Sequence, residues 1–95
     1  HIPMISTVRP GVIEVQDGGK TTARFMVAGG FAEVTRERCT VLAEEAQPFE
    51  DVSADQLAKR LRDAQEALAE AAPAARSAAE RAVSVAQDLQ RAYAY

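Results

Sequence analysis

The chain has 95 residues, a formal net charge of −3 and one cysteine, Cys39. A chain of this length forms one small domain with a modest core, and its acidic balance disfavours a nucleic-acid partner, because phosphate backbones bind clustered positive charge. A lone cysteine excludes an internal disulfide, and no apolar run reaches the ~20 residues that a membrane-spanning helix needs.

The first half of the chain has the pattern of short β-strands. It enters at once on apolar residues, and within residues 11–16 Ile13 and Val15 fall on one face while Glu14 falls on the other. Residues 17–20, DGGK, supply a turn, because glycine adopts positive φ without steric cost. Further strands are predicted at residues 22–27, 31–35 and 39–43, the last two separated by a charged turn. Short strands at regular spacing predict a β-sandwich or a barrel.

The glycine pair at residues 29 and 30 and the single cysteine could each have either a structural or a chemical role. Gly29 and Gly30 could form an anion-binding nest, but a break in the strand that needs small residues is the preferred explanation. Cys39 opens a predicted strand, so we expect a buried structural thiol and not a nucleophile.

The apolar period changes near Gln47 and Pro48. Proline lacks an N–H and disfavours helix in the residue before it. Ser53 and Gln56 then have capping-box spacing, in which Ser53 accepts a hydrogen bond from the Gln56 amide and the Gln56 side chain reaches back. The spacing predicts a helix from Ala54 whose narrow apolar stripe consists of Leu57, Leu61, Ala64 and Leu68.

A second helix is predicted after Pro73, a residue that suits a first helical turn. On the first helix we expect two i,i+4 ion pairs, Lys59 with Asp63 and Arg62 with Glu66. The apolar stripe of the second helix consists of Ala79, Val83, Ala86, Leu89 and Tyr93.

The alanine-rich stripes allow the two helices to approach closely as an antiparallel hairpin. Such a hairpin buries little area, so it could fold back, open or extend on a partner; a permanently docked hairpin is equally compatible with the sequence. We therefore predict an α+β protein with a partial antiparallel β-sandwich at residues 1–47, a connector at 48–53 and an α-helical hairpin at 54–95.

Catalysis is not expected of this chain. It has one histidine, one cysteine, no phosphate-binding glycine loop, no metal-ligand cluster and no Ser/His/Asp constellation. We predict neither a cofactor nor a metal ion.

Several motifs occur in the order and spacing of a known family. They are HIP (residues 1–3), RPGVI (9–13), FMVAGGFAEV (25–34) and VLAEEA (41–46), followed by an alanine-rich, charged helical hairpin. In these the chain resembles the epsilon subunit of bacterial F-type ATP synthases, called delta in mitochondria. That family's sandwich has an earlier half, so the resemblance implies that His1 is an internal residue and that strands are missing before it.

The resemblance implies a non-catalytic rotor subunit that couples rotation of the c-ring to the gamma subunit and can regulate ATP hydrolysis through the hairpin. Its partners would be gamma, the c-ring and, through the hairpin, the alpha/beta head. The short hairpin favours a bacterial source, which implies a peripheral position on the cytoplasmic face of the inner membrane; a mitochondrial source implies the matrix face.

Contact residues follow from the same resemblance. The positions facing the c-ring are His1, Ile2 and Pro3, where a packing role for the lone histidine is favoured over pH sensing or ligation. The positions near gamma are Met4, Ile5, Ser6 and Ala28, for which core or edge packing is an equally good explanation.

The hairpin has a degenerate version of a motif through which some family members bind ATP, aliphatic-Asp-x-x-Arg. This sequence has Val52 at the aliphatic position, Ser53 for the aspartate and Gln56 for the arginine, so the phosphate-facing guanidinium is lost and ATP binding should be weak or absent. Candidate contacts to the head are Arg76, Arg81 and Arg91. Their alternative is a solvated face with local pairs such as Arg76 with Glu80.

A second function remains compatible with the sequence. A free-standing cytosolic adaptor or small-ligand binding module, with a β-sandwich and a helical arm, would have the same fold. Such a protein would be monomeric and absent from membranes.

Overall fold

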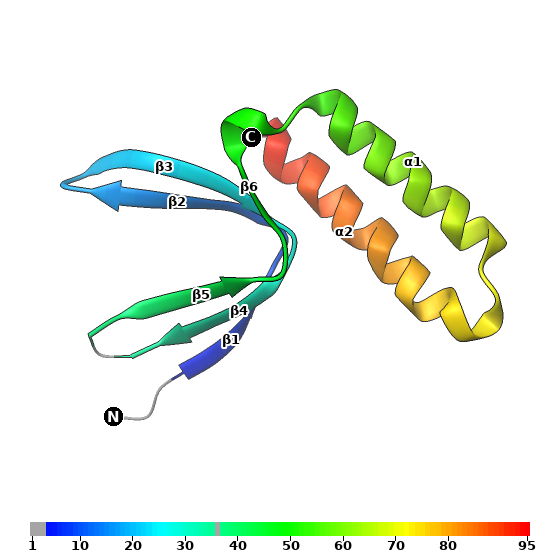
Figure 1. Ribbon diagram of the computed structural model, residues 1–95, viewed down its shortest axis with the longest axis horizontal. Helices are drawn as coiled ribbons and strands as arrows, with labels where there is room; N and C mark the ends of the chain where they lie inside the picture. Colours follow the sequence, from blue (N-terminus) through cyan, green and yellow to red (C-terminus); the bar gives the residue numbers. More distant parts are fainter. Residues whose placement is uncertain (1–3, 36) are drawn as a thin grey trace.

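The computed structural model describes residues 4–35 and 37–95 (Figure 1). Within these residues six strands precede two helices, and a short 3₁₀ turn precedes each helix. In chain order the elements are β1 (Met4–Val8), β2 (Gly11–Asp17), β3 (Lys20–Val27), β4 (Gly30–Val34), β5 (Cys39–Ala43), β6 (Ala46–Pro48), η1 (Phe49–Asp51), α1 (Ala54–Glu70), η2 (Pro73–Ala75) and α2 (Arg76–Ala94). Strand β6 was not predicted. It is a short edge strand in the described part of the chain, a position that tolerates Pro48.

The strands form two three-stranded antiparallel sheets, β1-β4-β5 and β2-β3-β6. Hydrogen bonds continue through the bend between them, from the Ala28 amide to the Glu45 carbonyl at 3.0 Å and from the Glu44 amide to the Gly29 carbonyl at 3.1 Å. The two sheets are therefore joined at a bend, and they diverge from each other on the side away from it (Figure 1). This arrangement confirms the predicted antiparallel β-sandwich followed by a helical hairpin.

The register of β2 against β3 confirms the predicted alternation. Ile13 lies opposite Phe25 and Val15 lies opposite Ala23, so these apolar residues share one face of the sheet. The turn at residues 18 and 19 has φ of 59° and 82°, both glycine, which is the geometry that a tight hairpin requires.

Close packing explains the glycine at position 30. Gly30 is buried with φ of 140°, and a Cβ there would lie 2.2 Å from the Leu42 carbonyl oxygen and 2.8 Å from the Ala43 Cα. No side chain fits at that separation, so the bend between the sheets needs glycine for space.

The prediction of a buried thiol at Cys39 was wrong. Cys39 does begin a strand, but its side chain is exposed, as is its cross-strand neighbour Val34 at 44%. Val15 and Val41 are also 47% and 40% exposed. Within the described residues no element covers these parts of the sheets, and strand position alone does not bury a side chain.

The first helix begins as predicted, with one change. The Ser53 hydroxyl accepts a hydrogen bond from the Gln56 amide at 3.1 Å. The Gln56 side chain does not reach back to Ser53; instead it donates a hydrogen bond to Gln47 Oε1 on β6 at 2.9 Å. The Lys59–Asp63 ion pair forms at 2.6 Å. Among the described side chains none joins Arg62 to Glu66; both are exposed, and water competes for such pairs.

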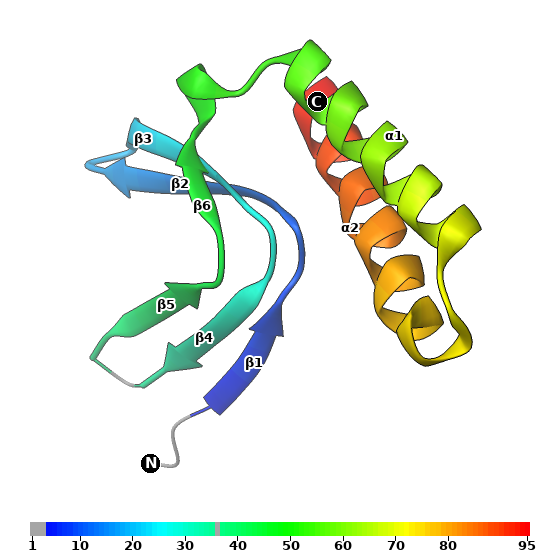
Figure 2. The ribbon, with the colours of Figure 1, turned by 45° about the vertical axis from the view of Figure 1, so that its right-hand side comes forward.

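The two helices run antiparallel, and the hairpin docks on the outer face of the β2-β3-β6 sheet (Figure 2). Four buried side chains form the core between hairpin and sheet: Met26 at 5% exposure, Val52 at 7%, Leu57 at 4% and Leu89 at 2%. Both predicted apolar stripes face inward, each buried or half-buried. In the described part of the chain, neither helix is long and apolar enough to cross a membrane.

Candidate functional site: the contact between hairpin and sandwich

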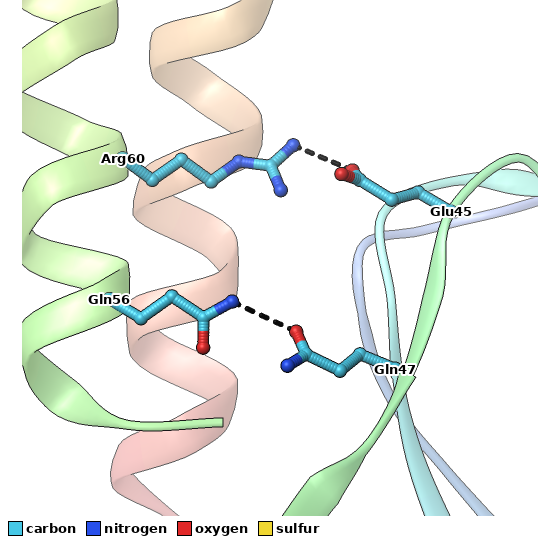
Figure 3. Close-up of polar contacts among 4 residues, drawn as sticks. All are labelled: Glu45, Gln47, Gln56 and Arg60. Atoms are coloured by element: carbon cyan, nitrogen blue, oxygen red, sulfur yellow. Dashed lines mark hydrogen bonds and ion pairs between the residues drawn. The ribbon is translucent and has the colours of Figure 1, made fainter. Parts of the chain in front are cut away.

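Two polar contacts join the first helix to the edge of the sandwich, and we call these four residues the polar bridge. Arg60 Nη2 donates to Glu45 Oε2 at 2.9 Å, and Gln56 Nε2 donates to Gln47 Oε1 at 2.9 Å (Figure 3). Gln47 also donates to the Asp51 carbonyl at 3.1 Å. The side chain of Gln47 therefore links β6, the connector and α1.

The end of the second helix is attached to the sandwich by stacked side chains, which we call the aromatic strap. The ring centroids of Phe49 and Tyr93 lie 5.4 Å apart, with 26° between the ring planes. The Arg24 guanidinium carbon lies 4.3 Å from the centroid of the Phe49 ring. Residues from β3, η1 and α2 thus form one stack, at separations typical of aromatic and cation–π attraction.

A cavity of about 70 Å³ lies beside the polar bridge. It is lined by Met26, Ala28, Glu45, Ala46, Gln47, Gln56, Leu57, Arg60 and Leu89. Pockets that bind small organic ligands measure ~300–1,000 Å³, so the docked hairpin leaves room for a few water molecules at this place.

The residues of the degenerate ATP motif all have structural contacts. Val52 is buried in the hairpin–sheet core, Ser53 caps α1 and Gln56 belongs to the polar bridge. The motif therefore lies where the hairpin meets the sandwich, and its side chains are engaged within the chain.

The candidate positions for a gamma contact fall in two places. Met4, Ile5 and Ser6 belong to β1, whose backbone pairs with β4. Ala28 lies at the bend between the sheets and is half-buried against the hairpin–sheet core. The structure does not bring these positions together in one sheet. The candidate c-ring residues, His1, Ile2 and Pro3, lie outside the described residues.

The candidate head-contacting arginines all lie on α2 and are exposed. Arg91 forms an ion pair with Asp88, whereas the alternative pair of Arg76 with Glu80 is absent among the described side chains. Arg76 and Arg81 occupy the half of the helix nearer the turn between α1 and α2. Their guanidinium groups are available to an acidic surface.

Sequence reasoning missed both the Arg60–Glu45 pair and the aromatic strap. The paired residues are 15 positions apart in the first case, and the strap joins three separate elements. Helical periodicity indicated only that Tyr93 faces inward. Within residues 4–35 and 37–95, no group of three or more His, Cys, Asp or Glu side chains could hold a metal ion.

Comparisons with known proteins agree on one family. Residues 1–49 match the model of the ATP synthase delta/epsilon chain β-sandwich domain. The ATP synthase epsilon chain of Rhodospirillum rubrum is 49% identical over 90 residues, which cover 94% of this chain and 67% of that protein. The epsilon chain of Paramagnetospirillum magneticum is 56% identical over 71 residues, covering 75% and 53%.

A solved structure agrees in fold as well. One chain in a cryo-EM structure of the Euglena gracilis mitochondrial ATP synthase, comprising OSCP, F1 and the c-ring, superposes with a TM-score of 0.72 at 30% identity. The superposition covers 97% of this chain and 58% of that one. This chain therefore spans between about half and two thirds of the length of these three relatives.

Proposed function

This chain belongs to the ATP synthase delta/epsilon chain family, and from that premise we propose that it is part of a central-stalk rotor subunit of a proton-translocating F-type ATP synthase. The observation that carries the proposal is the 49% identity over 90 residues, because that alignment includes both the sandwich and the hairpin. A shared sandwich alone would support only a shared fold.

In this role the chain is a non-catalytic coupling subunit. The sandwich lies against the gamma subunit and the c-ring, with β1 and the bend at Ala28 toward gamma and residues 1–3 toward the ring. The subunit is peripheral, at the cytoplasmic face of a bacterial inner membrane.

Co-isolation tests this role. The full-length polypeptide is tagged, membranes are extracted in mild detergent, and the proteins that accompany it are identified by mass spectrometry. The rotor role predicts gamma, c subunits and a head that hydrolyses ATP. Recovery of the polypeptide alone from the soluble fraction would contradict the role and support the adaptor alternative.

We further propose that the hairpin regulates ATP hydrolysis, with Arg76 and Arg81 directed toward acidic residues of the head when the hairpin leaves the sandwich. Their exposure and lack of an ion pair within the described residues support this assignment. Deleting residues 54–95 should change the ATPase rate of the assembled complex. An unchanged rate in a complex with full subunit content would exclude the regulatory role.

A further inference from the structure

The docked position of the hairpin depends on few buried contacts. The core between hairpin and sheet contains four buried side chains, of which α1 contributes one, Leu57, and α2 contributes one, Leu89. Each helix is packed chiefly against the other in the half that extends away from the sheet (Figure 2). Contacts at the rim of this small core therefore contribute substantially to the stability of the docked hairpin.

Two contacts lie at the rim of this core, the Arg60–Glu45 pair of the polar bridge and the aromatic strap, and they differ in strength. The Arg60–Glu45 pair lies at the surface, with side chains 38% and 58% exposed, and exposed ion pairs contribute little because water and salt screen them. The aromatic strap joins half-buried rings, and aromatic pairs contribute ~0.5–1.5 kcal/mol beyond the area that they bury. The strap is therefore the stronger of the two.

The strap also has a favourable position. Phe49 lies in the connector between β6 and α1, and Tyr93 lies in the last turn of α2. A single stack thus attaches the connector and the C-terminal end of α2 to β3 through Arg24. No ion pair engages Arg24 in the described part of the chain, so its guanidinium remains available to the Phe49 ring.

We propose that, among the contacts around the buried core, the aromatic strap, the stack of Arg24 on Phe49 on Tyr93, is the one that keeps the hairpin docked, and that the polar bridge only sets the register of α1 on β6. Separating Tyr93 from Phe49 frees the C-terminal end of α2 and the connector in one step. The effect of that release on ATP hydrolysis rests on the proposed function; the strap itself does not.

A distance measurement in the assembled complex tests the strap. One spin label is attached to Cys39, the exposed thiol on β5, and the other to Ser84→Cys on the exposed face of α2. Pulsed electron paramagnetic resonance then reports the distribution of distances between sheet and hairpin. We expect Tyr93→Ala to raise the ratio of undocked to docked hairpin about tenfold, which corresponds to ~1.4 kcal/mol.

The chain provides a matched control for this substitution. Tyr95 follows two residues later, is fully exposed at 108%, and takes no part in the stack, so Tyr95→Ala should leave the distribution unchanged. Tyr93→Phe keeps the ring and should also leave it unchanged. Arg24→Gln removes only the cation and should raise the ratio about two- to fivefold.

Two results would overturn the proposal. One is a distribution for Tyr93→Ala and Arg24→Gln that equals that of Tyr95→Ala. The other is release of the hairpin by Arg60→Gln to the same extent as by Tyr93→Ala. If circular dichroism shows that Tyr93→Ala has lost helix, the distance distribution of Arg24→Gln decides between the two outcomes. Arg24 is exposed, so its substitution should leave the helices folded. Co-isolation of gamma and c subunits is scored separately, so failure of the proposed function is distinguished from failure of the strap.

Discussion

The side-chain amide of Gln56, in the first turn of α1, donates a 2.9 Å hydrogen bond to the side chain of Gln47 on β6. Gln56 occupies the position at which ATP-binding relatives are expected to have arginine. This hydrogen bond occupies a side chain that could otherwise face a ligand. It also spans the contact between hairpin and sandwich, which we call the joint.

Weak or absent ATP binding is the first prediction. Gln56 cannot offer the charged, bidentate contact that a guanidinium makes with phosphate, and the adjacent cavity of about 70 Å³ is small. Isothermal titration calorimetry of the full-length polypeptide should detect no binding in the micromolar range, and Ser53→Asp with Gln56→Arg should bind more tightly. A Kd at or below the low micromolar range for the unaltered protein would refute this.

The polar bridge should contribute little to stability. Glu45→Gln weakens an ion pair in which the Glu45 side chain is 58% exposed. We therefore expect the free energy of unfolding to fall by at most ~1 kcal/mol, and by less at high salt. Urea unfolding of the variant and the unaltered protein, in low and in high salt, measures this difference in stability. Glu44→Gln is the matched control, because Glu44 is exposed and has no ion pair in the described part of the structure. A loss well above 2 kcal/mol would mean that the bridge is a principal anchor.

Leu89 should be the most costly side chain of α2 to truncate. It is 2% exposed and lies in the core between hairpin and sheet, so Leu89→Ala should destabilise the chain by ~2–5 kcal/mol through lost burial and a residual cavity. Leu42→Ala makes the same chemical change at a side chain that is 71% exposed and should cost less than ~0.5 kcal/mol. Equal shifts in the urea midpoints would show that Leu89 is not buried in solution.

A methyl group at position 30 should disrupt the bend between the sheets. Gly30→Ala would place Cβ 2.2 Å from the Leu42 carbonyl oxygen at a φ of 140°, and we expect a loss of at least ~2 kcal/mol from strain and overlap. The nearest atom to a Cβ at Gly11 is 4.0 Å away, so Gly11→Ala should have a small effect. Thermal unfolding of the two variants compares them directly, and a Gly30→Ala midpoint equal to that of Gly11→Ala would argue against close packing at the bend.

Local patterns in the sequence determined most of the elements. Alternation placed Ile13 and Val15 on one face, paired glycines placed the turn between β2 and β3, and the Ser53 cap placed the start of α1 at Ala54. Periods of 2 and 3.6 residues are properties of a single strand or helix, so they can be read without knowing what lies beside it. Fold class followed from these patterns, and family membership from the ordered motifs.

Only the tertiary structure decided which residues meet across the joint. The Gln56 side chain bonds to Gln47 on β6 and not to its expected local partner, Ser53. Arg24, Phe49 and Tyr93 stack although they belong to three elements. The exposure of Cys39 was likewise decided by the tertiary structure, because the burial of a strand residue depends on which elements cover the strand. Such contacts depend on how the hairpin docks on the β2-β3-β6 sheet, which is a balance of small packing terms among residues far apart in the chain.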